Sequence, residues 1–380
     1  MKKTFLLLAC ASMMASSAMA QMSLVKEVAK VAGSNKVEEL QTALSKIQPA
    51  LTNSETARDA QTWFVAGKAA FGLFDQMQAH KQLGQEVDAA LMGKTLMDGF
   101  NYLQTALPLD SVKETNKDGS FKLDKEGNPK VKTKYSKDIN TLLSGHINDV
   151  YSFAGECINE QKYDMASQAY NYFFNLMDKD FAKSAGIQLS AEDLAMTKFF
   201  QGFAQYYSKD FVNSYKNLTT AIMGGYNENN VNLYQTSAMA NVIQGLVDAK
   251  DFSGAMRFLD DALVTTPDNS MIYDMKGFVA EQDKGTDAAL PFYQKSVELD
   301  PNNADANYNL GRMYYNQASK IIVDNPTATT SQLVPMLQPI YEKALPYLKK
   351  AGEIDPEKGK DAKRLIDDID YKYEQMGLKK

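Results

Sequence analysis

The chain has 380 residues, 44% of them hydrophobic and 23% charged, which provides ample material for a buried core. Its 47 acidic residues outnumber its 41 basic ones, and the formal net charge is −6. General nucleic-acid binding needs a basic surface, so this charge balance disfavours that class of function.

The N-terminus has the pattern of an export signal. Lys2-Lys3 precede an apolar run from Phe5 to Ala15, and Ala18-Met19-Ala20 supplies the small residues of a cleavage site. We therefore expect residues 1–20 to be a signal peptide and the chain to be exported, either periplasmic or otherwise associated with the cell envelope. The apolar run is too short to span a bilayer, and no later stretch has the length of a transmembrane helix.

The cysteines leave one alternative open. Leu7-Leu8-Ala9-Cys10 is similar to a lipoprotein cleavage site, at which Cys10 would carry the lipid. This cysteine falls inside the apolar run, however, and the small-residue site further along favours ordinary cleavage. After that cleavage Cys157 is the one remaining cysteine, so no internal disulfide is expected.

Residues 21–109 are predicted to hold N-terminal helices and a divergent first repeat. Apolar residues at helical spacing mark one short helix, namely Val37, Leu40, Leu44 and Ile47. A later helix carries Trp63 and Gly67, and its partner contains residues 99–106. The separation between these two helices is about twenty residues longer than in the evenly spaced units at residues 236–356, which are described below. Residues 75–98 are therefore either an insertion or an extension of both helices.

Residues 110–137 interrupt the helical pattern. Asp118-Gly119 and Glu126-Gly127-Asn128-Pro129 are turn signals, and they alternate with the short segments 121–123 and 130–132. We expect a small exposed β-hairpin or mobile loop inserted between helices.

Residues 138–235 are predicted to form two divergent repeats. The first has apolar or small residues at the packing positions of its leading helix, namely Val150, Phe153, Ala154 and Cys157. The second begins after the capping sequence Ser190-Ala191-Glu192-Asp193 and has Gly202 and Leu218 at its helix contact.

Three clear units occupy residues 236–356, with evenly spaced starts at 236, 270 and 304. Within residues 270–303 we expect helices at about 271–282 and 286–299. Gly277 and Ala289 allow their backbones to approach closely, and Tyr293 fills the space beside them. Pro301 cannot continue the second helix and therefore ends it.

The C-terminal part departs from this regular spacing. The last unit has an insertion at residues 320–340, which contains Pro335 and Pro339. Residues 357–380 are predicted to form a capping helix that covers the end of the array. Its outer face is rich in lysine and aspartate, as the exposed end of a repeat array requires.

The repeat at residues 270–303 resembles the tetratricopeptide repeat. Its small residues stand at the eighth and twentieth positions, its aromatic residue at the twenty-fourth and its proline at the thirty-second. The even spacing of the three starts also matches the period of that family, which is about 34 residues. The resemblance implies an all-α fold, an α-solenoid of five to six tetratricopeptide helix pairs with a small β-hairpin insertion. Because stacked repeats grow in one dimension, we expect one elongated domain.

No arrangement of residues predicts a catalytic, metal or cofactor site. Gly93-Lys94-Thr95 lacks the glycine that a phosphate-binding loop needs five residues earlier. His80 and His146 lie in separate regions without a neighbouring cysteine or histidine, so a zinc site is not expected. Cys157 occupies a core position and is predicted to be an inert thiol. We expect no enzyme activity and no cofactor.

Aromatic residues supply the candidate binding site. In repeats of this kind the first helix lines a concave groove, and the resemblance places a set of aromatic and polar side chains there: Tyr151, Phe278, Tyr308, Arg312, Tyr315 and Asn316. Rigid aromatic side chains are common anchors at binding surfaces. Phe199, Phe203, Tyr206 and Tyr207 fall on similar positions, and for them packing between repeats is an equally good interpretation.

We expect a non-catalytic scaffold of the bacterial cell envelope that binds a protein or peptide in this groove, with no nucleic-acid partner. One alternative is a glycan-binding component of an envelope uptake system, since aromatic side chains also stack on sugar rings. A second alternative is an unrecognised enzyme. The sequence does not identify the partner or the oligomeric state.

Overall fold

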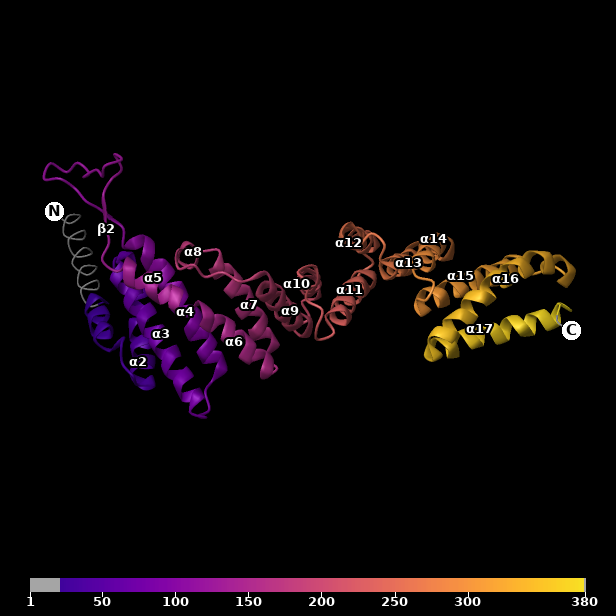
Figure 1. Cartoon of the computed structure of the whole chain (residues 1–380), viewed down its shortest axis with the longest axis horizontal. Helices are drawn as coiled ribbons and strands as arrows, with labels where there is room; N and C mark the ends of the chain where they lie inside the picture. The colour runs from indigo at the N-terminus through magenta and orange to yellow at the C-terminus, as the bar shows by residue number, and fades with distance from the viewer. Residues whose placement is uncertain (1–20, 379–380) are drawn as a thin grey trace, which may run out of the picture. The chain divides into compact units, whose positions relative to one another are not determined.

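The computed structural model describes residues 21–378, most of them in α-helices (Figure 1). Residues 1–20, which include the expected signal peptide and Cys10, lie outside the described residues. Within residues 21–378, no helix combines the length and the apolar character that crossing a membrane requires.

The chain divides into two compact units, and each is described by itself. Unit 1 ends at Asn232 and unit 2 begins at Leu233, so the boundary falls within α11 (Val231–Asp248). The expectation of one elongated domain was therefore wrong in this respect. The physical reason is that each helix pair contacts its immediate neighbours and few others, so an array of such pairs can separate where the contacts between successive pairs are few.

Unit 1 begins with a helix over residues 21–31. It continues with elements whose bounds are α2 (Val37–Thr52), η1 (Thr56–Arg58), α3 (Ala60–Gln82), α4 (Ala89–Leu109), β1 (Val112–Lys113), β2 (Val131–Lys132), α5 (Ser136–Gly145), α6 (Ile147–Asn159), α7 (Tyr163–Met177), α8 (Asp180–Ser184), α9 (Ala191–Tyr207) and α10 (Phe211–Met223). The pairs α3/α4, α6/α7 and α9/α10 pack against each other. Residues 75–98 thus extend both helices of the first pair.

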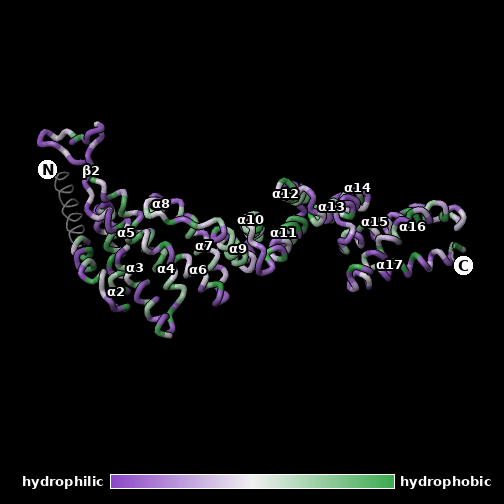
Figure 2. Tube along the Cα trace, viewed as in Figure 1, coloured by the Kyte–Doolittle hydropathy of each residue, from purple (hydrophilic) through white to green (hydrophobic). Residues whose placement is uncertain are grey.

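A small β-hairpin separates α4 from α5, as expected. Val112 pairs with Lys132 and Lys113 with Val131 in an antiparallel register. The tip is held by two isolated bridges, and the segment is largely hydrophilic (Figure 2). The turn signals predict short segments at 121–123 and 130–132. Residues 131–132 do form β2, but its partner strand β1 is formed by residues 112–113, which precede both turn signals.

The base of the hairpin is closed by one buried carboxylate. Asp110 caps the end of α4, and its side chain is only 4% exposed. It accepts hydrogen bonds from the backbone N–H groups of Lys134, Tyr135 and Ser136 at 2.7–3.1 Å, and from the Ser136 hydroxyl at 2.7 Å. Burial alone would raise the pKa of Asp110, but these hydrogen bonds outweigh it and hold the pKa below its ordinary value.

Unit 2 contains most of α11 and six further helices: α12 (Phe252–Thr265), α13 (Ser270–Lys284), α14 (Thr286–Leu299), α15 (Ala304–Asp324), α16 (Thr330–Ile354) and α17 (Pro356–Gln375). The pairs α13/α14 and α15/α16 make extensive contacts, and α17 packs on both α15 and α16. Tyr293 and Tyr341 are the largest side chains of this unit's core that are almost fully buried.

The expected insertion at residues 320–340 is absent as a separate segment. These residues lengthen α15 and α16, and only residues 325–329 connect the two helices. Pro335 and Pro339 lie inside α16, where the sequence predicted an interruption. Both prolines are exposed, so water can satisfy the carbonyl groups whose partner N–H is missing.

Four glycines share one structural role in the helix pairs. A Cβ atom added to Gly67, Gly202, Gly277 or Gly311 would lie 2.5–2.7 Å from a large side chain of the partner helix, which is Leu103, Leu218, Tyr293 or Leu348 respectively. Real Cβ atoms essentially never approach that closely. In these four pairs the first helix therefore carries a glycine that a large residue of the second helix covers, and this contact occurs in both units.

Candidate functional site

The helices α13, α15 and α17 of unit 2 present a half-buried face that is both aromatic and charged. Tyr308, Arg312 and Tyr315 lie on one side of α15 at spacings of four and three residues. Arg312 forms a bidentate ion pair with Glu281 of α13, with both N–O distances at 2.8 Å. The hydroxyl of Tyr315 donates to Asp368 of α17 at 2.7 Å.

Further charges surround these three side chains. Lys372 lies 2.5 Å from Asp368, and its ammonium group is 5.1 Å from the centre of the Tyr315 ring. Lys358 forms an ion pair with Asp305 and lies 5.9 Å from the centre of the Tyr308 ring. Both tyrosines are therefore held beside fixed cations, an arrangement that stabilises one orientation of each ring.

One carboxylate on this face lacks a direct cationic partner among the described residues. Asp274 of α13 accepts a hydrogen bond from the Asn309 amide at 3.0 Å. Burial raises the pKa of Asp274 to about 6, and the hydrogen bond from Asn309 opposes this shift only in part. The ionised form of Asp274 is therefore destabilised in the folded chain.

Replacing Asp274 with asparagine is expected to stabilise unit 2 by about 1–3 kcal/mol at pH 7–8. Because the pKa of Asp274 is raised by folding, the folded chain binds a proton at this carboxylate more tightly than the unfolded chain does. The native chain therefore gains stability as pH falls from 7 towards 4. The advantage of Asp274→Asn should shrink as pH falls through 6 and disappear near pH 4. Urea unfolding followed by circular dichroism across this pH range measures the difference in stability between the native chain and Asp274→Asn. Asp287→Asn is the control, because Asp287 is exposed. An advantage that is constant with pH would contradict the assignment.

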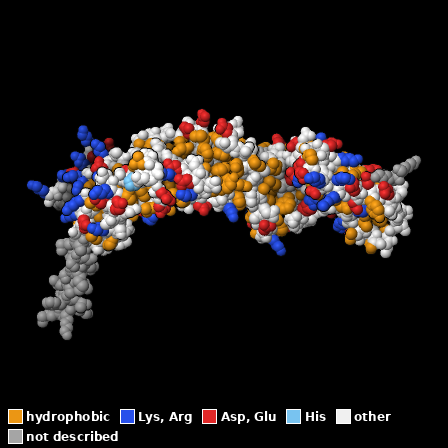
Figure 3. All heavy atoms as spheres, turned by 90° about the horizontal axis from the view of Figure 1, so that it is seen from below, with side chains coloured by type: hydrophobic (Ala, Val, Ile, Leu, Met, Phe, Trp, Pro, Cys, Tyr) orange, Lys and Arg blue, Asp and Glu red, His pale blue; other side chains and the backbone are white. Residues whose placement is uncertain are grey.

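Unit 1 contains a separate cluster of aromatic side chains. The ring of Tyr207 stacks on Tyr163 with a centroid distance of 4.5 Å and also contacts Phe203 at 4.9 Å. Tyr207 is 43% exposed, and apolar side chains gather on the surface around α9 and α10 (Figure 3). Tyr163, from the first turn of α7, was missed by sequence analysis because it belongs to a second helix of a pair.

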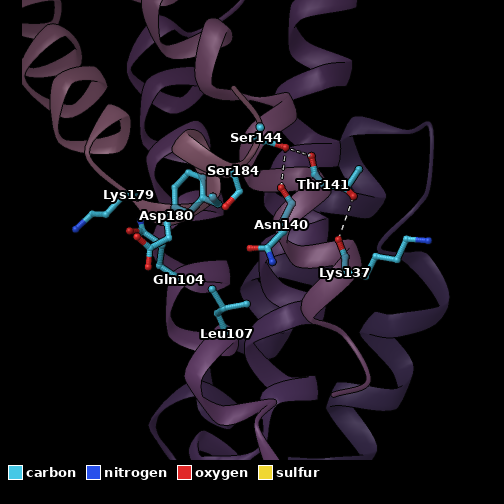
Figure 4. Close-up of a pocket in the computed structure, with 11 residues that line it drawn as sticks. Gln104, Leu107, Lys137, Asn140, Thr141, Ser144, Lys179, Asp180 and Ser184 are labelled. Carbon is cyan, nitrogen blue, oxygen red and sulfur yellow. Dashed lines mark hydrogen bonds between the residues drawn. The ribbon is translucent and has the colours of Figure 1, made fainter. Parts of the chain in front are cut away.

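A pocket of about 600 Å³ in unit 1 lies between α4, α5 and α8 (Figure 4). Two of its hydroxyl groups donate within their own helix: Ser144 donates to the carbonyls of Asn140 and Thr141, and Thr141 donates to that of Lys137. Lys179 and Asp180 complete the polar part of the lining. The acceptors of these two hydroxyls are thus backbone carbonyls of α5.

The comparison with protein families matches residues 286–318 to the tetratricopeptide repeat. The matched residues comprise α14 and most of α15, and they include Tyr293, the residue that covers Gly277. The chain is a tetratricopeptide repeat protein. None of the curated proteins matches this tetratricopeptide repeat protein.

Solved structures with some similarity are themselves tetratricopeptide repeat proteins. One from Bacteroides fragilis is 16% identical, covers 59% of this chain and 98% of its own, and has a TM-score of 0.36. YrrB, described as having an unusual peptide-binding site, is 19% identical over 57% of this chain and 90% of its own, with a TM-score of 0.31. The C-terminal part of a repeat protein from Cytophaga hutchinsonii is 12% identical over 87% of this chain and 95% of its own, with a TM-score of 0.31.

In this tetratricopeptide repeat protein, the residues predicted for the groove are all half-buried. Phe278, Tyr308, Arg312, Tyr315 and Asn316 belong to α13 and α15 of unit 2, which pack side by side. Tyr151 belongs to α6 of unit 1, where its ring contacts Tyr170 and Phe173. Of the other aromatic residues considered, Phe199 is only 2% exposed and stacks on Tyr226, so it is a core residue.

The sequence did not indicate the charged partners on this face. Glu281 and Asp368 lie 31 and 53 residues from the side chains that they bind, on different helices. Their spacing from Arg312 and Tyr315 follows from how successive helices stack, and no local pattern encodes it.

Proposed function

We propose that this tetratricopeptide repeat protein is a non-catalytic scaffold of the bacterial cell envelope that binds a protein or peptide through an aromatic groove. Repeats of this family generally serve as interaction scaffolds. The observation that carries the proposal is the face of α15, on which Tyr308, Arg312 and Tyr315 are half-exposed and are held by α13 and α17.

Preorganisation is the physical reason for choosing this face. Ordering a long or aromatic side chain on binding costs about 0.5–1.5 kcal/mol, and side chains that are already held avoid most of that cost. The Arg312–Glu281 pair and the Tyr315–Asp368 hydrogen bond fix two of the three side chains in the free chain. An extended peptide contacting this face would therefore meet rigid aromatic anchors and fixed charges of both signs.

Export to the envelope is a further part of the proposal. It is supported by the N-terminal pattern of Lys2-Lys3, an apolar run and Ala18-Met19-Ala20. Intact-mass measurement of the exported chain should give a mature N-terminus at Gln21. Lipid attached to Cys10 would instead make it a membrane-anchored lipoprotein.

Truncating the aromatic anchors is expected to weaken binding. The partner would first be identified by cross-linking in the native envelope, and the cross-linked segment would then be synthesised and titrated against purified chain. Tyr308→Ala and Tyr315→Ala should each weaken its binding by about 1–2 kcal/mol. Asp287→Asn, on an exposed position of α14, should leave the affinity unchanged.

The control for folding is Tyr314→Ala. Tyr314 is 8% exposed and packs in the core of unit 2, so its truncation should destabilise the fold. If Tyr308→Ala and Tyr315→Ala unfold the chain as readily as Tyr314→Ala does, the face is packing between repeats and carries no binding site. Binding of envelope polysaccharide in place of any peptide, with the same loss in both variants, would establish the glycan alternative.

A further inference from the structure

His146 occupies a fixed position between two helices of unit 1. It is the residue between the end of α5 and the start of α6, and only 12% of its side chain is exposed. Its ring stacks on Phe71 of α3 with a centroid distance of 3.9 Å, and the ring of Phe74 meets it edge-on at 6.3 Å. These aromatic contacts hold the imidazole in one orientation.

Two carboxylates face the same ring nitrogen. Nδ1 of His146 lies 2.8 Å from Oδ2 of Asp149, in the first turn of α6, and 3.8 Å from Oδ1 of Asp75, on α3. The three candidate ligand atoms all lie within 4.8 Å of one another. Asp75 and Asp149 have no lysine or arginine in an ion pair within residues 21–378, so even a protonated imidazole leaves one negative charge uncompensated.

We propose that Asp75, His146 and Asp149 form a binding site for Zn²⁺, which would join α3 to the start of α6. The proposal does not depend on the binding function proposed above. The sequence predicts no zinc site because His80 and His146 lie in separate regions without a neighbouring cysteine or histidine. The three ligands are brought together by the fold, because Asp75 and His146 belong to different helix pairs and are far apart in sequence.

The ligand set and its spacing favour zinc over calcium or magnesium. Calcium and magnesium prefer sites built of oxygen atoms, whereas zinc binds imidazole nitrogen together with carboxylate oxygen. Ligand bonds of about 2.0–2.2 Å around zinc place neighbouring ligand atoms roughly 3.3–3.6 Å apart in a tetrahedron. The two distances from Nδ1, 2.8 and 3.8 Å, bracket this range, and all three ligand atoms lie within 4.8 Å of one another, so side-chain rotations would bring them to zinc-binding distances.

The fourth position of such a site is open. Half of the Asp75 side chain is exposed, so water or a carboxylate from another molecule can reach the metal. Because its ligands come from α3 and from the start of α6, bound metal would stabilise the contact between these two helices, which belong to successive helix pairs.

The test is calorimetric titration of the metal-free full chain with Zn²⁺. We expect one saturable site that raises the melting temperature. Asp75→Asn and His146→Asn should each weaken binding by at least about tenfold. Asparagine at position 146 can still donate a hydrogen bond to Asp149, so this variant removes the ligand and keeps the hydrogen bond.

The matched control is His80→Asn, which removes the only other histidine of the chain and should leave zinc binding unchanged. Circular dichroism establishes that each variant is folded. Absence of saturable binding to the native chain would overturn the proposal, and the cluster would then be a hydrogen-bonded ion pair at the start of α6. Binding that persists undiminished in folded Asp75→Asn and His146→Asn would overturn it equally.

Discussion

Replacing Tyr293 with alanine is expected to destabilise unit 2 by about 3–5 kcal/mol. Tyr293 is 1% exposed and is among the largest fully buried side chains of the described residues. Its ring covers Gly277, whose missing side chain is what allows α13 and α14 to approach, and its hydroxyl donates to Glu281 at 3.3 Å. Truncation would leave a cavity at the closest contact of the pair, next to the Arg312–Glu281 ion pair.

The measurement is urea unfolding monitored by far-ultraviolet circular dichroism. Tyr371→Ala is the matched control, since Tyr371 belongs to the same unit and is 59% exposed, and it should cost less than about 0.5 kcal/mol. Similar losses for the two variants would mean that the contact between Tyr293 and Gly277 does not organise this helix pair.

Replacing Asp110 with alanine is expected to destabilise unit 1 by about 3 kcal/mol or more. The carboxylate accepts three backbone N–H groups and one hydroxyl, and these donors would lose their acceptor. A buried donor without a partner costs about 1–3 kcal/mol, and hydrogen bonds to a charged acceptor are among the strongest in proteins. The base of the hairpin and the start of α5 would lose the hydrogen bonds that hold them to the end of α4.

The pH dependence of this effect identifies its origin. The pKa of Asp110 is lowered by folding, so the ionised carboxylate stabilises the native chain above its ordinary pKa, and this contribution is lost as pH falls through the lowered value. The difference between native chain and Asp110→Ala should therefore be largest near neutral pH and diminish in acid. Asp118→Ala, at the exposed tip of the hairpin, is the control and should have little effect. A cost for Asp110→Ala that does not change in acid would show that packing, and not the charge, stabilises this site.

The helix pairs could be predicted from sequence because their determinants are local. Gly277, Ala289 and Tyr293 lie close together within a single repeat, and their sizes alone specify where two helices touch. Pro335 and Pro339 led to a wrong prediction because the rule that proline interrupts a helix ignores exposure. On the outer side of α16 the unpaired carbonyls are solvated, and the helix continues.

The candidate site was predictable only in part, for a related reason. The spacing of Tyr308, Arg312 and Tyr315 places them on one face of any helix, and the structure has them so. What each side chain touches depends on the register between successive helices, which sequence spacing within one helix does not specify. The register between helices determines the contacts of Glu281 and Asp368, and it also brings Asp75 close to His146. None of these contacts could be predicted from the sequence.

Because Asp110 closes the base of the hairpin, we expect residues 111–133 to be replaceable without loss of the fold. Both ends of this segment meet at one carboxylate, so the path of α4 into α5 is determined without the intervening strands. A foreign peptide or a small folded domain inserted at Glu126-Gly127 would lie between chain ends that Asp110 still holds together. The helix pairs would not have to rearrange to accept it. The hairpin between α4 and α5 is therefore the position at which we expect this scaffold to accept unrelated inserts.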